Sequence, residues 1–517
     1  MKKVISFILM IVTVTACLFG GCFKEDKKNA LVIEAHSAGY GEDWIAFMAQ
    51  EFEKETGIKV IVEYQVGTQG ISNMDTNIKT LTSETDIFFT GGAAFAEVYR
   101  GEITAGGQKY SCLFEDLSDL YNSTIPGENI TVKDKMNAVT RADVEINGTY
   151  YHFPYVTGMQ GFIRNMDVWD SSWTVPRTTN ELFELCETIK NSNKVNEANQ
   201  KVYPFIYSLA DEYWTSMLPV FVSQYEGVER MNKFWQGYGP DGKRYSNNMI
   251  AYEGVLKALE FFHDLLVDSN GYMHKDSKDT SFTNMQSMFL EGVAVMNCNG
   301  DWLENEMYLN YPDAKIEMMK LPILSAVADK CSFAENANKE QILRELIDYV
   351  DGVDATLPAG ATADDAAIVA EARSFERSGS ANCAIIPSYS NKIEEAKNFL
   401  RFMASDKGLE IFRDKTNGCR APFDYSNVPA REESTFRNSV NEVMARVENY
   451  GGSRKKDKIF SIGEINPDLF NNKYGRFVGV LAAKNVADYK NALVYFNEEV
   501  KTVNDALSNA KRKAGIA

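Results

Sequence analysis

The sequence predicts an α/β protein with open parallel sheets, and three observations support this. Its 517 residues are 44% hydrophobic and 12% aromatic, which is ample for a packed core and excludes wholesale disorder. The length corresponds to about three average domains, with two large ones as the alternative. Residues 30–64 read as strand, helix and strand, the βαβ unit from which parallel sheets are built.

The first hundred residues continue this alternation. In order, the apolar patterns predict a strand at 30–34, a helix at 43–54, a strand at 58–64, a helix at 73–82 and a strand at 86–89. Gly57 stops the first helix. Ligands of open parallel sheets bind beyond the carboxyl ends of the strands, and these ends carry Tyr40, Glu42, Thr90 and Gly91.

The rest of the chain adds elements less regularly. Thr178 and Glu181 form a capping signal that opens a helix through Lys190. Pro154 lies inside a predicted strand at 149–155, which makes that strand an edge or a crossover. The remaining predicted elements are strands at 161–164, 292–297 and 383–387, a crossing segment at 315–321, an acidic helical insertion at 333–380, and helices at 251–266, 284–290, 393–403 and 407–414.

The N-terminus has the features of an exported chain. Two lysines precede an apolar run at 4–15 that is too short to span a bilayer as a folded anchor. Small residues directly before Cys22 resemble a bacterial lipobox, in which the cysteine carries lipid. We therefore expect a signal peptide at 1–21 and a lipid-anchored tether at 22–28, with Cys17 as the alternative lipidation site. An ordinary signal peptide with incidental cysteines is the competing interpretation.

Charge and metal-ligating residues narrow the function classes. The net charge of -18, from 54 Lys and Arg against 72 Asp and Glu, argues against a nucleic-acid partner. Only four His occur, none close in sequence to another, so we expect no metal site of the zinc type. Six cysteines beyond the tether have no C-x-x-C spacing, and we interpret most as buried thiols, with one disulfide left open: Cys112, Cys186, Cys298, Cys331, Cys383 and Cys419.

Five segments carry a resemblance to a known family. They are FEKETGIKV at 52–60, DIFFTGG at 86–92, YYHFPYVTGMQGFIRN at 150–165, FLEGVAVMNCNGDW at 289–302 and NKIEEAKNFLRFMASDKGLEIF at 391–412. With the lipobox, their order resembles that of the family 1 extracellular solute-binding proteins of ABC importers, the maltose-binding-protein-like group. The segments span most of the chain that follows the signal peptide.

The resemblance implies a two-lobed, periplasmic-binding-protein-like fold of type II, with a ligand cleft between the lobes. We expect lobe one at 29–153 and 318–425, and lobe two at 154–317 and 426–517. Such a protein binds a small molecule, here expected to be a sugar or an oligosaccharide, and delivers it to ABC permease subunits. We expect a monomer without cofactor or bond chemistry, anchored to the outer face of the bacterial cell membrane.

A sugar site requires flat aromatic faces together with carboxylates, amides and Arg that form hydrogen bonds. Trp302 matches the family position in the G-x-W turn, which often stacks on sugar, and is the leading candidate. The expected ligand-binding residues are Trp302, Tyr40, Glu42, Trp214, Tyr213, Tyr155, Asp301, Asn299, Thr90, Gly91, Gln69 and Arg420. With 6 Trp, 25 Tyr and 30 Phe in the chain, most aromatic rings belong to the core.

Two other functions stay open. A surface glycan hydrolase or lyase needs two acids that face a cleft, and 72 acids make chance pairs inevitable. A ligand-binding sensor lipoprotein would share every feature above. The sequence contains no H-E-x-x-H or G-x-S-x-G motif, and a run at 237–243 that nearly matches a P-loop has Arg244 where Ser or Thr must hold magnesium.

Overall fold

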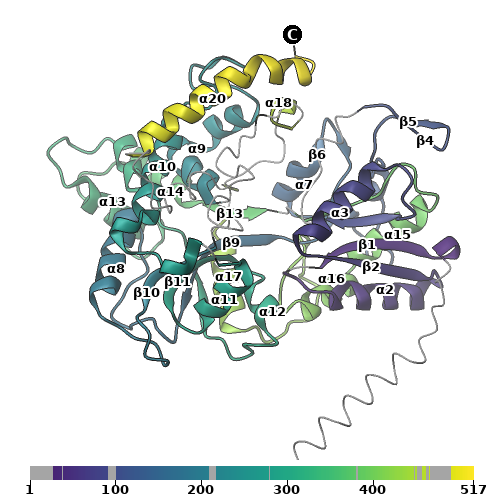
Figure 1. The fold of residues 1–517 in the computed structure, drawn as a ribbon, viewed down its shortest axis with the longest axis horizontal. Coiled ribbons are helices and arrows are strands. Elements are labelled where there is room, and N and C mark those ends of the chain that lie inside the picture. Colours follow the sequence, from purple (N-terminus) through teal and green to yellow (C-terminus); the bar gives the residue numbers. More distant parts are fainter. Residues whose placement is uncertain are drawn as a thin grey trace, which may run out of the picture.

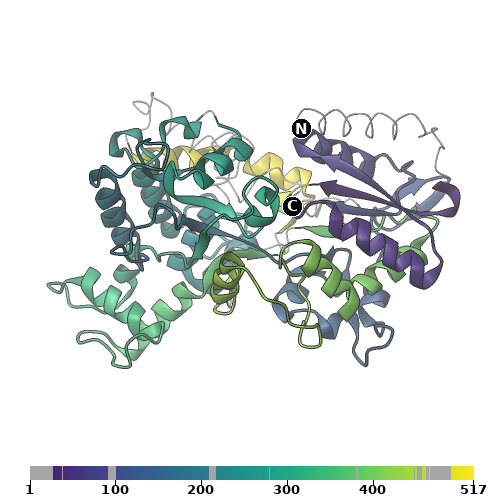
Figure 2. The same ribbon diagram turned by 90° about the horizontal axis from the view of Figure 1, so that it is seen from below.

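The computed structural model describes residues 27–37, 39–90, 101–208, 217–278, 280–379, 382–447, 449–450, 457–461, 465 and 491–516. Two main sheets, each covered by helices, form two lobes that lie side by side (Figures 1 and 2). The α/β class and the two-lobed arrangement predicted from the sequence are confirmed.

Lobe one is built on a five-stranded sheet with the strand order β2-β1-β3-β14-β8. Strands β1, β2 and β3 are parallel, with Ile33 opposite Ile87, as βαβ connections require. Gly57 ends α2 in the left-handed conformation at φ 73°, and its N–H donates to Glu53 O. Up to the first crossing, the elements are η1 (Lys27–Asn29), β1 (Leu31–Ser37), α2 (Asp43–Thr56), β2 (Val60–Val66), α3 (Gly67–Lys79), β3 (Ile87–Thr90), β4 (Ile103–Ala105), β5 (Gln108–Tyr110), α5 (Ser118–Asn122), α6 (Val132–Lys135), α7 (Ala138–Val144), β6 (Glu145–Ile146), β7 (Thr149–Tyr150) and β8 (Phe153–Pro154).

Lobe two is built on a sheet with the order β10-β11-β9-β13-β15, in which β12 also pairs with β9. The Thr178 side chain caps α8 by accepting from Glu181 N, as the capping signal predicts. This stretch contains β9 (Gly158–Asn165), α8 (Thr179–Asn191), β10 (Tyr203–Ile206), α9 (Leu218–Trp235), α10 (Glu253–Leu266), η3 (Asp268–Asn270), η4 (Lys275–Lys278), α11 (Phe282–Leu290), β11 (Ala294–Gly300), α12 (Leu303–Met307), β12 (Ile316–Met319), η5 (Ser325–Lys330), α13 (Lys339–Val350), α14 (Ala363–Arg373) and β13 (Phe375–Gly379).

The C-terminal part of the chain contributes to both lobes. It returns to lobe one with β14 (Cys383–Ile385), α15 (Ile393–Met403) and α16 (Asp406–Lys415), and ends with α17 (Thr435–Met444), β15 (Asn449–Tyr450), α18 (Lys458–Ser461) and α20 (Ala492–Lys513). The described chain therefore passes between the sheets after β8, after β13 and before α17, which packs on β12. Figure 1 shows β9 running between the two halves.

Each lobe has its own core. The lobe-one core contains Trp44, Phe89 and Phe412, and the larger lobe-two core contains Phe205 and Phe221. Each sheet buries its apolar residues mainly against its own helices, so the two cores are largely independent of each other.

The segment between β12 and β13 belongs to lobe two, so the expectation that residues 318–379 belong to lobe one is wrong. Leu321, Leu343 and Val369 are all buried in the lobe-two core. The segment expected to cross at 315–321 instead forms β12, which returns antiparallel beside β9. The acidic insertion that follows therefore stays on lobe two.

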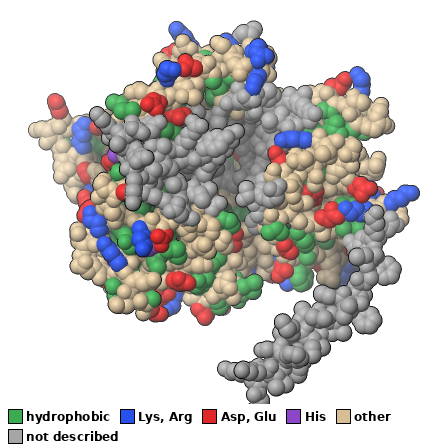
Figure 3. All heavy atoms as spheres, in the orientation of Figure 1, with side chains coloured by type: hydrophobic (Ala, Val, Ile, Leu, Met, Phe, Trp, Pro, Cys, Tyr) green, Lys and Arg blue, Asp and Glu red, His purple; other side chains and the backbone are tan. Residues whose placement is uncertain are grey.

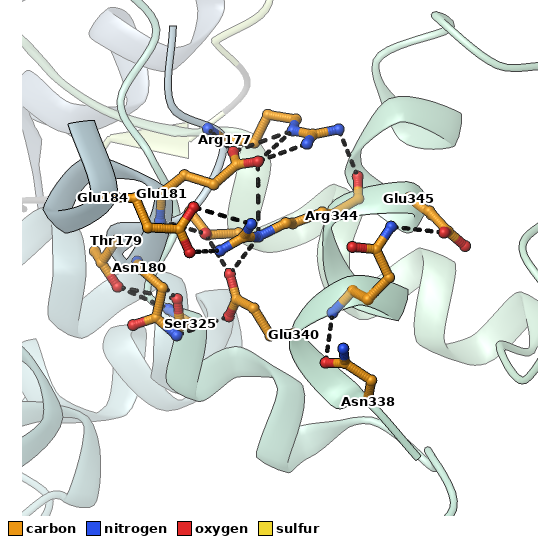
Figure 4. A network of polar contacts seen from close by, with 12 residues as sticks. Arg177, Thr179, Asn180, Glu181, Glu184, Ser325, Asn338, Glu340, Arg344 and Glu345 are labelled. Carbon is orange, nitrogen blue, oxygen red and sulfur yellow. Dashed lines mark hydrogen bonds and ion pairs between the residues drawn. The ribbon is translucent and has the colours of Figure 1, made fainter. Parts of the chain in front are cut away.

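Ion pairs fasten this insertion to α8 (Figure 4). Arg344 of α13 lies 2.7 Å from Glu184 and 2.8 Å from Glu340, and 3.6 Å from Glu181. Arg177, just before α8, also contacts Glu181. The guanidinium of Arg344 is mostly buried at 16% exposure, so its charge is best satisfied by several carboxylates at once.

The surface charges, the cysteines and the possible metal ligands of the described residues can each be compared with the expectations from the sequence. On the face in Figure 3, acidic and basic side chains are interspersed rather than separated by sign. None of the described helices is both long and apolar enough to cross a bilayer. The six cysteines beyond the tether form no disulfide with one another, which answers the open question of a disulfide among them. Within the described ranges, no group of three or more His, Cys, Asp or Glu is placed to hold a metal ion. Cys17 and Cys22 lie outside the described residues.

Candidate functional site

The carboxyl ends of β1 and β11 meet at the junction of the two lobes. The loop after β1 carries Gly39 and Tyr40, and the turn after β11 carries Asp301 and Trp302. The Tyr40 hydroxyl donates to Oδ1 of Asp301 at 3.5 Å. Farther along, Asn305 Nδ2 of α12 donates to Gly39 O at 2.8 Å. The structure thus brings together three of the residues expected to bind ligand, from opposite lobes.

Trp302 lies within this junction. Its ring meets the Tyr40 ring edge to face, with the centroids 6.3 Å apart and an interplanar angle of 70°. It folds over Gly300 and against Gly39, where a Cβ atom would lie 2.1 Å and 3.2 Å from it. The indole packs against the lobe-one core although Trp302 follows a lobe-two strand, and it is only partly buried. Trp302 therefore bridges both lobes and keeps some exposed surface.

A buried ion pair adjoins the aromatic pair. Asp301 and Arg437 are each 2% exposed, and Arg437 Nη1 lies 3.1 Å from Asp301 Oδ2. Arg437 Nη2 also donates to Asp301 O at 2.7 Å and reaches Cys419 Sγ at 3.0 Å. Met159 N donates to Asp301 Oδ1 at 3.2 Å. Because Cys419 belongs to the lobe-one core, Arg437 links α17 and the turn after β11 to lobe one.

Burial sets the protonation of this cluster. Burial, together with the Asp301 charge, raises the pKa of the Tyr40 phenol well above its usual value, so Tyr40 is a neutral donor at physiological pH. Burial likewise raises the pKa of the Cys419 thiol to about 12, so this thiol is protonated and unreactive. The cluster can hold and orient groups, and it offers no activated nucleophile.

His36 is a polar residue of the junction region that sequence reasoning missed. It lies near the carboxyl end of β1, opposite Gln65 of β2. Its Nε2 atom is buried and has no hydrogen-bond partner among the described residues. Burial lowers the pKa of the His36 imidazole below 6.5, so the ring is neutral at pH 7. The available signal was a titratable side chain one residue before the end of a parallel strand.

Helix α12 adds two more polar residues that sequence reasoning missed. Glu306 accepts from Gln286 Nε2 at 2.8 Å and from the Gly39 N–H, and burial raises the pKa of the Glu306 carboxyl. Asn305 Oδ1 accepts from Asn417 Nδ2 at 3.2 Å. The sequence offered one signal for them: Asn305 and Glu306 follow Trp302 by three and four residues, a spacing that places side chains on the same face of a helix. Together they tie the loop after β1 to α12.

Two expected residues lie in the core of lobe one. Tyr155 is 3% exposed, its ring stacks on Trp44 at a centroid distance of 5.4 Å, and its hydroxyl donates to Thr90 O at 3.2 Å. The Thr90 hydroxyl donates to Cys383 O between neighbouring strands. The rings of Tyr155 and Trp44 cover one another, so Tyr155 does not present a free face as the expectation required.

Three further expected residues lie apart from the Trp302 contacts. Asn299 is fully buried in β11, and its Oδ1 accepts from the N–H of Gly300. Glu42 is exposed at the N-cap position of α2 and accepts from the Ser37 hydroxyl at 2.7 Å. The Arg420 side chain is exposed, with its guanidinium 5.1 Å from the centre of the Tyr425 ring.

The side chains or positions of the remaining four expected residues lie outside the described part of the structure. Gly91, Tyr213 and Trp214 lie outside the described residues. Gln69 lies in α3, where the structure describes its backbone but not its side chain.

A solved structure shares this architecture. It comes from a study of xylan utilisation by the thermophilic bacterium Caldanaerobius polysaccharolyticus, and it superposes with a TM-score of 0.61 at 14% sequence identity. The superposition covers 92% of this chain and 100% of that chain. Among curated proteins, no match is found. The shared fold and the two independent cores define an architecture of two α/β lobes that meet at a junction.

The family model for bacterial extracellular solute-binding proteins matches residues 48–423. The chain belongs to this family. Membership implies a small-molecule ligand and an extracytoplasmic location, in agreement with the resemblance found in the sequence.

Proposed function

We propose that this protein captures a saccharide between its lobes and delivers it to an ABC permease in the membrane. The observation that carries this proposal is the junction, where a partly exposed indole, a phenol and a carboxylate from opposite lobes lie in contact. A sugar ring has apolar C–H faces that stack on an aromatic ring and hydroxyl edges that bond to carboxylates and amides. Trp302, which is only partly buried, supplies an aromatic face for such stacking.

The proposed mechanism is closure of the lobes around the ligand. A ligand that touches both walls binds the closed arrangement more tightly than the open one, and it shifts the population by that difference in affinity. His36 on lobe one is a further candidate for bonding a ligand hydroxyl, because its buried Nε2 has no hydrogen-bond partner among the described residues. The permease then distinguishes the closed form, and no bond is made or broken.

We also propose that lipid on Cys22 holds the protein, as a monomer, at the outer face of the cell membrane. The lipobox-like sequence before Cys22 and the polar tether behind it support this. Two or more acyl chains give stable anchoring, whereas a single chain binds only marginally.

The test is a thermal shift measurement with the purified protein against a panel of sugars. Xylo-oligosaccharides come first in the panel, because the solved structure with this fold comes from a study of xylan utilisation. We expect at least one saccharide to raise the Tm, since a ligand that binds only the folded state stabilises it. A panel without any such rise would contradict the proposal.

The matched variants are Trp302→Ala and Trp173→Ala. Trp302→Ala should weaken binding by about tenfold or more, which corresponds to about 1.4 kcal/mol. Trp173 packs edge to face on Trp169 in lobe two, so its removal should leave affinity unchanged. Equal affinity in both variants would remove Trp302 from the site. Release of reducing ends from any sugar of the panel would instead favour a hydrolase.

A further inference from the structure

A buried carboxyl group lies next to one of the passages between the lobes. Glu376 is in β13, the last lobe-two strand before the chain returns to lobe one with β14. Strand β13 pairs with β9, the other strand at a crossing, through Arg377 opposite Gln160 and Gly379 opposite Gly158. Glu376 therefore lies three residues before the end of β13, where the chain crosses to lobe one, and a change in its charge is felt next to that crossing.

The Glu376 carboxyl is almost completely enclosed and only half satisfied. The residue is 1% exposed, and its Oε1 accepts from Leu321 N at 3.1 Å. Its Oε2 is buried and has no hydrogen-bond partner among the described residues. A carboxylate removed from water needs hydrogen-bond donors at both oxygens, so a site that supplies a donor at only one oxygen favours the neutral acid.

The charged groups around Glu376 are already engaged with another acid. Arg373 of α14 lies 2.8 Å from Asp351, and Lys320 after β12 lies 3.1 Å from the same carboxylate. Arg373 also donates to Leu321 O at 2.6 Å. Helix α9, which packs on β13 as well, contributes the neutral Gln224, which bonds the chain at 322 and 324. Burial raises the pKa of Glu376 to about 7, against the opposing effects of Leu321 N–H and of Arg373.

We propose that Glu376 makes the crossing strand sensitive to proton concentration, and that loss of its proton near neutral pH shifts the lobes away from the described arrangement. In the neutral state the carboxyl holds the chain at Leu321 against β13. Once ionised, its free oxygen needs Lys320, Arg373 or water as a hydrogen-bond donor, and bringing one there displaces β13, which leads directly into the crossing to β14 of lobe one. A binding protein outside the cell would then open and close in response to the pH of its surroundings.

The direction of the effect on stability follows from the raised pKa. In the unfolded chain Glu376 titrates near its usual value of about 4.3, and in the folded chain near 7. The stabilisation by the bound proton is therefore complete below about pH 4.3 and is lost as pH rises to 7. Above pH 7, Glu376 is ionised in both the folded and the unfolded chain, so its contribution to the free energy of unfolding no longer changes with pH.

The test compares wild type, Glu376→Gln and Glu335→Gln without ligand, so it does not depend on the proposed transport function. Glu376→Gln keeps the shape of the neutral acid, and Glu335 is an exposed acid that serves as the matched control. From pH 5 to pH 7, the Tm of wild type and of Glu335→Gln should fall relative to that of Glu376→Gln and then level off. The radius of gyration in solution scattering should rise across pH 7 in wild type and in Glu335→Gln only.

Parallel Tm curves for wild type and Glu376→Gln, or the same expansion in both, would overturn the proposal. The wild-type protein alone provides a second measurement if Glu376→Gln does not fold. Its unfolding at pH 6 should release about one proton more than its unfolding at pH 8, as measured by calorimetry in buffers of different ionisation enthalpy. No such difference would also overturn the proposal.

Discussion

At the junction of the lobes, Arg437 is a buried cation that contacts residues of both lobes. Its guanidinium, 2% exposed, binds the side chain and the carbonyl of Asp301 and contacts Cys419. Arginine suits this position because its planar fork presents several donors in fixed directions. Asp301 in turn adjoins Trp302, so the ion pair sets the position of the indole that we propose as the sugar platform.

Replacing Arg437 with Met should lower the free energy of unfolding by about 3–5 kcal/mol, because it leaves the Asp301 carboxylate buried without its partner. The double variant Asp301→Asn with Arg437→Met should recover part of this loss, since it no longer buries a lone charge. Denaturant unfolding measures both values. The control is Lys501→Ala, which breaks an exposed pair with Asp505 and should leave stability unchanged. A double variant no more stable than Arg437→Met would show that the ion pair is not the cause.

At this scale, the sequence identified residues that meet at the junction only where a local pattern existed, and their role in ligand binding stays a prediction. Asp301 and Trp302 follow a strand in a G-x-W turn, and their position at a strand end made them recognisable. Arg437 lies 136 residues from Asp301 in a helix without any motif, and only the packing of α17 on β12 brings the two together. The expectation that Tyr155 presents a free ring did not hold, because an aromatic residue at a strand end does not reveal in the sequence which other ring will cover it.

The inserted segment shows how elements are placed by charge as well as by apolar packing. Helix α13 buries Leu343 and Ile347 in the lobe-two core, and it also carries Arg344 into a group of carboxylates from α8 and from its own helix. In Figure 4 the Arg344 side chain points from α13 toward Glu181 and Glu184. A mostly buried cation with several acceptors contributes more than an isolated surface pair.

Replacing Arg344 with Ala should lower the free energy of unfolding by about 1–2 kcal/mol, because three carboxylates lose their shared donor. The loss should be smaller in 0.5 M salt. There the Debye length is roughly half that in physiological buffer, so part of the attraction is screened. Denaturant unfolding in both buffers measures it. Arg512→Ala, an exposed arginine of α20, is the control and should have no effect in either buffer. Equal effects of the two substitutions would contradict this role of Arg344.

The elements themselves were largely predictable, but the lobe that holds the inserted segment was not. Strands β1, β2, β3 and β11 and the cap of α8 fall where the apolar patterns and the capping signal place them. The insertion was expected in lobe one because its sequence position follows a segment interpreted as a crossing. Nothing local distinguishes a strand that crosses from one that returns beside β9, since both are short apolar runs.

At the scale of the whole molecule, the two lobes form separate cores that meet through a small number of specific contacts. Tyr40, Asn305 and Arg437 each contact a residue of the other lobe. The family to which the chain belongs binds solutes outside the cell, and the proposed closure would change the angle between these two cores.

The proposed anchor gives a prediction at this scale. Cys22→Ser should release the protein from the membrane fraction into the soluble fraction of the host cells, because no acyl chain is then attached. Cys17→Ser should leave it membrane-bound, so this variant is the matched control. Fractionation followed by immunodetection measures the outcome. Release by Cys17→Ser instead would assign the lipid to Cys17, and retention of both variants would argue against a lipid anchor.

The sequence by itself determined the α/β class, the succession of strands and helices, and the family, because apolar periodicity and short turn motifs act over a few residues. Tertiary structure alone decided which lobe holds the insertion, which aromatic rings are covered, and which distant polar groups meet, such as Asp301 with Arg437 and the Glu376 carboxyl with the Leu321 N–H. Those outcomes depend on burial and on contacts between residues more than fifty positions apart, and a charge becomes decisive only once folding has removed it from water.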